Sequence, residues 1–192
     1  ARAPQRLRAL ASPPQSSDPT NSHTFAVLTT AEMSSTPRFS TASSLDVVGI
    51  GNAIVDVLVQ TEDQFLSDHN LSKGSMALVD EDQAKSLYEA SGPGLETSGG
   101  SAANTLAGLA QLGSQAGFIG RVRDDQLGTI FIHDIRAVGT RFETPAAVTG
   151  ASTARCLILV TSDAERTMCT YLGASTQLDP DDLDLSMVRD TK

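Results

Sequence analysis

The sequence predicts an α/β fold in which a mainly parallel sheet is flanked by helices and a small second sheet stands apart. Short apolar runs with strand character alternate along the chain with segments whose apolar residues recur at helical spacing. Three strand-like runs, near residues 54–60, 155–160 and 167–172, have no helices between them that would place them in the parallel sheet. We expect these three runs to pair with one another in the small sheet.

The individual elements follow from local signals. Strands are expected at 45–50, 54–59, 75–79, 116–119, 155–160 and 167–172. Helices are expected at 61–69, 80–91, 101–112 and 126–138. Thr61 with Gln64, and Asp80 with Gln83, have the spacing of side chains that cap the first turn of a helix. Residues 161–164 predict a hairpin turn between the last two strands.

The helix expected from Ser101 carries leucines at a spacing that predicts one buried face. Leu106, Leu109 and Leu112 recur every three residues, which places them near one side of a helix. Gly113 follows directly and is a typical helix terminator. We therefore expect this helix to pack its leucines against a sheet.

Composition excludes several classes of function. The net charge of −9 and the pI near 4.6 argue against nonspecific binding of nucleic acid, which depends on Lys and Arg facing phosphates. No apolar run approaches the roughly 18 residues of a membrane-spanning helix. Cys156 and Cys169 fall in neighbouring predicted strands and are expected to be buried thiols in a reducing compartment. His23, His69 and His133 have no metal-ligand spacing, so no metal site is predicted.

Residues 1–44 differ in composition from the body of the chain. They contain 15 Ser or Thr, five Pro and only two acidic residues, so they are predicted to be disordered. The Arg-rich, acid-poor start is typical of an organelle transit peptide. Alternatively, residues 1–32, which precede Met33, are upstream sequence outside the natural protein, and we favour this interpretation. Residues 45–192 carry a net charge of −11, which favours a small-molecule ligand over a polyanion.

The most informative motif is the segment 99–104, which reads GGSAAN. Gly99 and Gly100 allow a ligand to approach the backbone, because no Cβ stands in the way. The small residues that follow can begin a helix whose first N–H groups have no partner within the helix. Asn104 adds a side-chain amide, and Asp56 ends a strand-like run upstream. A carboxylate, an amide and free N–H groups together suit the vicinal diol of a sugar.

Four blocks of the sequence, in order, resemble the PfkB/ribokinase family of carbohydrate and nucleoside kinases. The family's signature resembles residues 99–120, which read GGSAANTLAGLAQLGSQAGFIG. Residues 45–56, LDVVGIGNAIVD, resemble its first strand and its substrate-binding Asp. Residues 120–128 resemble a turn after the next strand, and residues 149–174 resemble a strand pair. The Asn52 and Arg166 regions are most similar to the adenosine-kinase-like branch.

This resemblance implies a ribokinase-like fold, in which the small sheet is a lid over the substrate, and an ATP-dependent phosphotransferase that uses Mg2+. The acceptor would be a hydroxymethyl group of a sugar or nucleoside, with an adenosine-like acceptor favoured. Asn52, Asp56, Gly99, Gly100 and Asn104 would bind it. Exposed strand edges of the lid favour pairing of two copies into a homodimer. The two cysteines favour a cytoplasmic protein, with organelle import as the alternative if residues 1–32 are a transit peptide.

One further residue has a role implied by the resemblance. Arg166 matches a family position in the lid that can face the phosphates. A guanidinium there could neutralise the charge that develops on the transferred group. The alternative is a solvated arginine of a hairpin.

The family's later Gly-Ala-Gly-Asp segment, which supplies its anion hole and catalytic base, does not occur in this sequence. Residues 45–192 are therefore expected to be the N-terminal portion of the fold, without a catalytic residue or a complete ATP site, and inactive in isolation. Two alternatives remain open: a non-catalytic binding or dimerisation module, and a defunct truncated product. Leu106 and Arg123 depart from the family pattern, which has small residues there.

Overall fold

The computed structural model describes residues 44–189 and 191–192. The predicted leader, with its interpretations as a transit peptide or as upstream sequence, lies outside the described residues apart from Ser44. Within the described part of the chain, no helix has both the length and the apolar character needed to cross a membrane.

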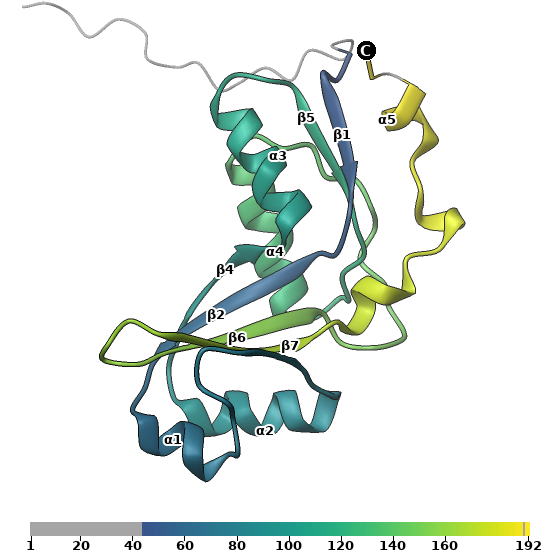
Figure 1. Cartoon of the computed structure of the whole chain (residues 1–192). Coiled ribbons are helices and arrows are strands. Elements are labelled where there is room, and N and C mark those ends of the chain that lie inside the picture. Colours follow the sequence, from purple (N-terminus) through teal and green to yellow (C-terminus); the bar gives the residue numbers. More distant parts are fainter. Residues whose placement is uncertain (1–43, 190) are drawn as a thin grey trace, which may run out of the picture. The chain divides into compact units, whose positions relative to one another are not determined.

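Two parallel strands form the first sheet. β1 (Val47–Ile50) pairs in parallel with β5 (Ala116–Ile119), with Val47 opposite Ala116. α3 (Ser101–Gln111) packs on both strands, and α4 (Gln126–Ala137) packs near it on β4 and β2 (Figure 1). Phe118 of β5 meets Phe131 of α4 and Phe142 with ring centroids 5.7 and 6.0 Å apart, and all three rings are buried. This aromatic cluster fixes α4 against the strand.

The second sheet has five strands rather than the predicted three. Its order is β3-β7-β6-β2-β4. The strand bounds are β2 (Ile54–Gln60), β3 (Met76–Leu78), β4 (Leu95–Gly99), β6 (Ala154–Val160) and β7 (Arg166–Tyr171). β2 pairs in parallel with β6, β3 pairs in parallel with β7, and the other two pairings are antiparallel. The described fold is thus α/β with mixed sheets, and the predicted small sheet gains β3 and β4 as its edges.

The five-stranded sheet has one covered face and one open face. Val55, Val57 and Val59 alternate along β2 on the covered face and are buried. This face packs on α1 (Asp63–Asp68) and α2 (Glu81–Ser91), which contribute the buried Leu66 and Leu87. The open face carries Asp56 and the exposed apolar side chains Leu58, Leu95, Met76 and Leu78. The ligand-binding candidate Asp56 therefore lies on the uncovered side of the sheet.

The helix termini test the predicted caps. Asp80 caps α2 as predicted, because its side chain accepts a hydrogen bond from the backbone N–H of Gln83 at 2.8 Å. The predicted cap at Thr61 is wrong, since α1 begins after Glu62 and no side chain caps it. A turn held by backbone hydrogen bonds and by the burial of Leu66 does not require a cap. The spacing of Thr61 and Gln64 therefore predicted the helix correctly but not its cap.

The leucine face of α3 is shorter than predicted. Leu106 is buried and Leu109 packs partly buried against the core, whereas Leu112 is 85% exposed. Leu112 is the C-cap residue of α3, and its backbone N–H still donates to the oxygen of Gly108 at 3.1 Å. The prediction for Leu112 is wrong because six residues at 100° each place it about 120° around the helix from Leu106.

Both cysteines are buried free thiols, as predicted. Cys156 lies opposite Thr170 and Cys169 lies opposite Leu157 in the antiparallel pair of β6 and β7. Side chains alternate along a strand, so the two thiols point to opposite faces of the sheet. The register therefore prevents a disulfide between them.

The last segment of the chain covers the first sheet. It contains the short helices η1 (Gly173–Gln177), η2 (Pro180–Asp182) and α5 (Leu185–Arg189), drawn in yellow in Figure 1. Met187 of α5 is buried with Leu45 and Ile119 in a small apolar cluster. An ion pair between Arg121 and Asp182, 2.5 Å long, joins η2 to the end of β5.

Candidate functional site

Asp56 is the centre of the candidate site. It is the third residue of β2, and its neighbours across the sheet are Thr97 of β4 and Cys156 of β6. The side chain is half-buried, and burial raises the pKa of its carboxyl above the ordinary value. Among the described residues, no group donates a hydrogen bond to this carboxylate. A half-buried carboxylate without a donor is suited to accept hydrogen bonds from a ligand.

Gly99 and Gly100 bring the backbone up to Asp56 and Asn52. A Cβ on Gly99 would overlap Oδ2 of Asp56, so only glycine fits beside this carboxylate. A Cβ on Gly100 would lie 2.7 Å from the backbone oxygen of Asn52, and Gly100 has a φ of 95°, which favours glycine. The glycine pair is therefore required by the site's own packing.

α3 begins directly after the glycine pair. Gly100 is its N-cap residue, and no side chain caps the helix. The backbone N–H of Asn104 donates to the backbone oxygen of Gly100 at 2.9 Å, which places Asn104 in the first turn, and its side chain is exposed. The uncapped N–H groups and the positive end of the helix dipole favour an anion or hydroxyl oxygen at this point.

Asn52 lies in the joint between the two sheets. Only Gly51, Asn52 and Ala53 separate β1 from β2, and Asn52 is exposed while Ala53 is fully buried. The backbone N–H of Gly51 donates to the oxygen of Ile119 at 3.1 Å, which holds the joint on β5. The structure thus brings together four predicted residues, Asn52, Asp56, Gly99 and Gly100, and places Asn104 in the turn that follows them.

Arg166 does not join this group. It begins β7 opposite Val160, whereas the row of Asp56 continues through Cys156 to Thr170, four residues further along β7. At about 3.3 Å per residue, this separation is about 13 Å along the sheet. Arg166 and Thr170 share a face, so the exposed Arg166 lies on the same open face as Asp56 but at the hairpin end.

The structure adds residues that the sequence did not single out. Thr97, Cys156 and Thr170 form the cross-strand row that contains Asp56. The hydroxyl of Thr170 lies 3.2 Å from Sγ of Cys156, and burial together with the nearby Asp56 charge raises the pKa of that thiol. Cys156 and Thr170 lie in predicted strands, whereas Thr97 lies in β4, which was not predicted. The row depends on a register that local patterns do not define.

The chemistry available to this arrangement is recognition of hydroxyl groups. Asp56 can accept two hydrogen bonds, one on each carboxylate oxygen, and the start of α3 offers N–H donors to the same ligand. The glycine pair lets the ligand approach without steric hindrance from a side chain. This combination of acceptors and donors matches a vicinal diol.

Comparison with known proteins identifies the family. The family model described as pfkB family carbohydrate kinase matches residues 76–190, which is more than half of the chain. The chain belongs to the pfkB family of carbohydrate kinases. The prediction made from the four sequence blocks is thus confirmed.

Individual pfkB relatives include sugar and nucleoside kinases. The chain is 31% identical over 109 residues to fructokinase of Solanum tuberosum, covering 56% of this chain and 34% of that protein. It is 36% identical over 97 residues to 5-dehydro-2-deoxygluconokinase of Clostridium perfringens, covering 49% and 29%. The crystal structure of adenosine kinase from Sinorhizobium meliloti is 49% identical, with a TM-score of 0.70, covering 78% of this chain and 46% of that one. The chain therefore spans about a third of the two curated relatives and just under half of the solved structure.

Two departures from the pfkB pattern have structural explanations. Leu106 is buried in the core, and its Cδ1 lies where a Cβ on Gly49 would come within 2.8 Å. Arg123 donates from its guanidinium to the backbone oxygen of Gly150 at 2.5 Å, and its backbone N–H donates to the hydroxyl of Thr153 at 2.9 Å. Arg123 therefore fastens the loop before β6 to the turn before α4.

Proposed function

We propose that residues 45–192 form the acceptor-binding part of an ATP-dependent kinase that phosphorylates a hydroxymethyl group of a sugar or nucleoside. One observation carries the proposal: the half-buried Asp56 carboxylate, without a donor among the described residues, lies against Gly99 at the uncapped start of α3. Membership of the pfkB family supports phosphoryl transfer to an alcohol as the reaction.

In the proposed complex, Asp56 accepts hydrogen bonds from two neighbouring hydroxyls of the acceptor. These hydroxyls replace the solvation that burial removes from Asp56, so binding lowers the raised pKa of its carboxyl. Gly99, Gly100 and Asn104 contact the same edge of the acceptor, and Asn52 lies beside them. The open face of the five-stranded sheet covers the ligand and excludes water from it.

We favour an adenosine-like acceptor over a hexose. Sequence identity does not separate the two, because the chain is 49% identical both to the Sinorhizobium meliloti adenosine kinase and to a probable sugar kinase from Rhizobium etli. The open sheet face beside Asp56 presents the apolar residues Leu58 and Leu95, against which the flat, largely apolar base of a nucleoside can pack. A free hexose carries hydroxyls on every side and gains less from such a surface.

The phosphate donor in this proposal is ATP with Mg2+. Within residues 44–189 and 191–192, no three His, Cys, Asp or Glu side chains are grouped to hold a metal ion. We assign the nucleotide site, the metal and the catalytic base to parts of the family's fold that this chain does not span, because it covers only about a third of its curated relatives. Arg166, on the same face as Asp56, is proposed to contact the transferred phosphate. The isolated chain is expected to bind acceptor without turning it over.

Calorimetric titration of the chain with adenosine tests the proposal. We expect binding of adenosine and weaker binding of fructose. No binding is expected for 2′,3′-dideoxyadenosine, which lacks the diol. The Asp56→Asn variant should lose adenosine binding, while Lys85→Met, on the exposed surface of α2, should retain it. Equal binding of adenosine and its dideoxy analogue would contradict the role of Asp56. Phosphorylation of adenosine by the purified chain would contradict the assignment of catalysis to other residues.

We also propose a homodimer formed through the five-stranded sheet, in a cytoplasmic protein. Met76 and Leu78 on β3 and Leu95 on β4 are 57–67% exposed, and these strands are the two edges of the sheet. Unpaired apolar edges favour pairing with a second copy. The two free, buried thiols support a reducing compartment. Analytical ultracentrifugation should show a dimer that Leu78→Lys weakens; a monomer at all concentrations would contradict it.

A further inference from the structure

The hairpin between β6 and β7 projects beyond its neighbouring strands. β2 ends opposite Val160, and β3 begins opposite Met168, so residues 161–165 have no strand beside them. The turn itself contains Ala164, a non-glycine residue with a φ of 66°. Backbone hydrogen bonds from Thr161 N–H to Glu165 O and from Ala164 N–H to Thr161 O shape the turn, and no neighbouring strand holds it in place.

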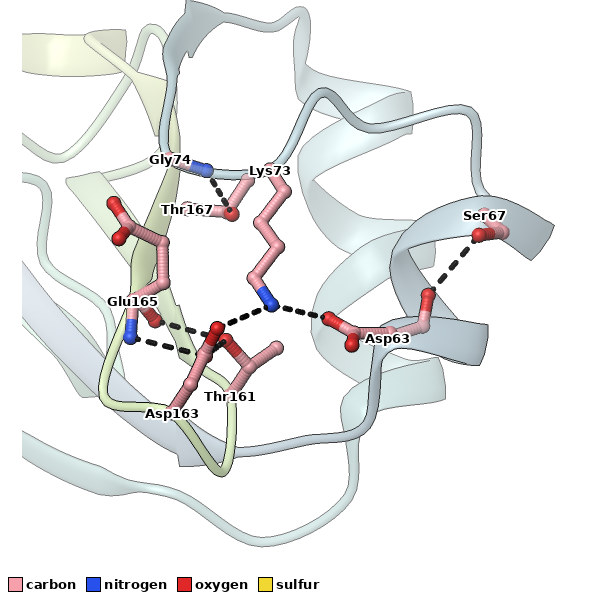
Figure 2. Close-up of polar contacts among 8 residues, drawn as sticks. All are labelled: Asp63, Ser67, Lys73, Gly74, Thr161, Asp163, Glu165 and Thr167. Atoms are coloured by element: carbon pink, nitrogen blue, oxygen red, sulfur yellow. Dashed lines mark hydrogen bonds and ion pairs between the residues drawn. The ribbon is translucent and has the colours of Figure 1, made fainter.

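Lys73 supplies a contact from outside the turn (Figure 2). Its ammonium donates to Oδ1 of Asp63 in α1 at 2.7 Å and to Oδ2 of Asp163 in the turn at 2.8 Å. The side chain of Lys73 is one-third exposed, so the bridge lies at the surface but is partly enclosed. One cation thus joins α1 to the tip of the hairpin.

Asp163 transmits this contact to the backbone of the turn. Its Oδ1 accepts from the hydroxyl of Thr161 at 2.6 Å and from the backbone N–H of Glu165 at 3.4 Å. The bond from Lys73 is the main cause that holds the pKa of the Asp163 carboxyl well below its usual range. The same bond is the first of the causes that raise the pKa of Lys73. Both groups are therefore charged at neutral pH.

A second contact holds the other side of the hairpin. The backbone N–H of Gly74 donates to the hydroxyl of the buried Thr167 at 3.0 Å (Figure 2). Arg166 lies between Glu165 and Thr167, and alternation along β7 directs it to the face opposite Thr167. Gly74 thus contacts β7 from the covered face, while the side chain of Arg166 extends from the open face.

We propose that Lys73 is a positioning residue for Arg166. By tying the hairpin to α1, Lys73 fixes the start of β7 and with it the direction from which the Arg166 guanidinium meets a phosphate on the acceptor. This inference rests on the proposed function, in which Arg166 contacts the transferred phosphate. Lys73 itself pairs with two carboxylates and acts on Arg166 only through the hairpin.

The test compares the acceptor with its phosphate ester. Affinities for adenosine and for AMP are measured by calorimetry in the wild-type chain, in Lys73→Met, in Arg166→Ala and in the double variant. Lys73→Met is expected to weaken AMP binding about two- to fivefold and to leave adenosine binding unchanged. In the Arg166→Ala background it should weaken AMP binding no further, because both changes act through one guanidinium.

Two further variants separate positioning from folding. Lys73→Arg should restore most of the AMP affinity, since a guanidinium can bridge the same two carboxylates. Lys85→Met removes an exposed lysine of α2 and should change nothing. In parallel, hydrogen exchange at the amides of Ala164 and Glu165 should be several-fold faster in Lys73→Met than in the wild type.

The outcomes are distinguishable. Unchanged AMP affinity in Lys73→Met, equal losses for adenosine and AMP, or a loss that persists without Arg166 would each overturn the positioning role alone. Unchanged exchange at the hairpin would do the same. If the wild-type chain binds neither ligand, the proposed function fails and the inference that rests on it fails too.

Discussion

The carboxylate of Asp56 occupies the space in which a side chain on Gly99 would lie. The two residues come from antiparallel strands, β2 and β4, and are offset by two positions in their register. Glycine at position 99 is therefore a condition for the rotamer of Asp56, and not only an opening for a ligand.

Replacing Gly99 tests this relationship. Gly99→Ala is expected to displace the Asp56 carboxylate and to weaken adenosine binding by about tenfold to a hundredfold, because the hydrogen-bonding geometry is lost. The control is Gly108→Ala within α3, where a Cβ meets nothing within 4 Å. This control should retain binding and gain about 0.5–1 kcal/mol of stability. Normal binding by Gly99→Ala, measured by calorimetry, would contradict the packing of Asp56 described above.

Removing the charge of Asp56 should raise the stability of the ligand-free protein while it abolishes acceptor binding. The raised pKa means that the folded state takes up the proton more readily than the unfolded state. The carboxyl therefore supports folding below its ordinary pKa of 3.8, and that support is lost as the pH rises through the raised value. Asp56→Asn should therefore stabilise the ligand-free protein at pH 7, by up to about 1 kcal/mol, while abolishing binding. Urea unfolding at pH 4 and pH 7 measures the free energy of unfolding of both proteins. A variant less stable than the wild type at pH 7 would contradict the raised pKa of Asp56.

The turn of the β6–β7 hairpin contains a residue in an unfavourable conformation. Ala164 has a φ of 66°, and the left-handed region costs a non-glycine residue about 1 kcal/mol. Ala164→Gly is therefore expected to raise the free energy of unfolding by a similar amount, partly offset by the greater freedom of glycine in the unfolded chain. Asn70 also has a positive φ, of 54°, but asparagine tolerates it better, so Asn70→Gly should gain less. Thermal unfolding of the two variants checks the order.

The two thiols should differ in their response to ligand. Burial raises the pKa of both Cys156 and Cys169, so both are expected to react with a disulfide reagent more than about tenfold slower in the native protein than in denaturant. Adenosine should slow the reaction of Cys156 further, because Cys156 lies beside Asp56 on the open face. It should not affect Cys169, which faces the helices. The single-thiol variants Cys156→Ala and Cys169→Ala assign the rates, and equal protection of both thiols would argue against ligand binding at this face.

Much of the fold could be predicted because its signals are local. The buried strand β5, the Asp80 cap and the glycines at the start of α3 each follow from a few neighbouring residues. β4 could not be predicted, since LETSG has little intrinsic strand preference and is held by pairing with β2. The backbone N–H of Ser98 even finds its partner on another element, in the side chain of Asp134 at 3.0 Å.

In the candidate site, too, some residues were predicted from the sequence and others were not. Asp56 and the glycine pair were predicted from sequence, and the structure brings them into contact. Thr97, Cys156 and Thr170 were not singled out, because a cross-strand row is defined by the register of three separate strands. The bridge through Lys73 had no sequence signal, because one of its two partners, Asp163, lies 90 residues away. Long-range polar contacts are set by the fold and leave no periodic pattern in the chain.

The three residues between β1 and β2 give the molecule one further property. Gly51, Asn52 and Ala53 connect strands of different sheets, and both ends of this joint are held: Gly51 on β5, and Ala53 by complete burial. Any change in the angle between the sheets would have to be taken up within these three residues, where the backbone oxygen of Asn52 lies against Gly100. The short joint therefore places the only backbone link between β1 and β2 at the edge of the candidate site. A pair of spin labels, one on each sheet, would measure such a change as a distance.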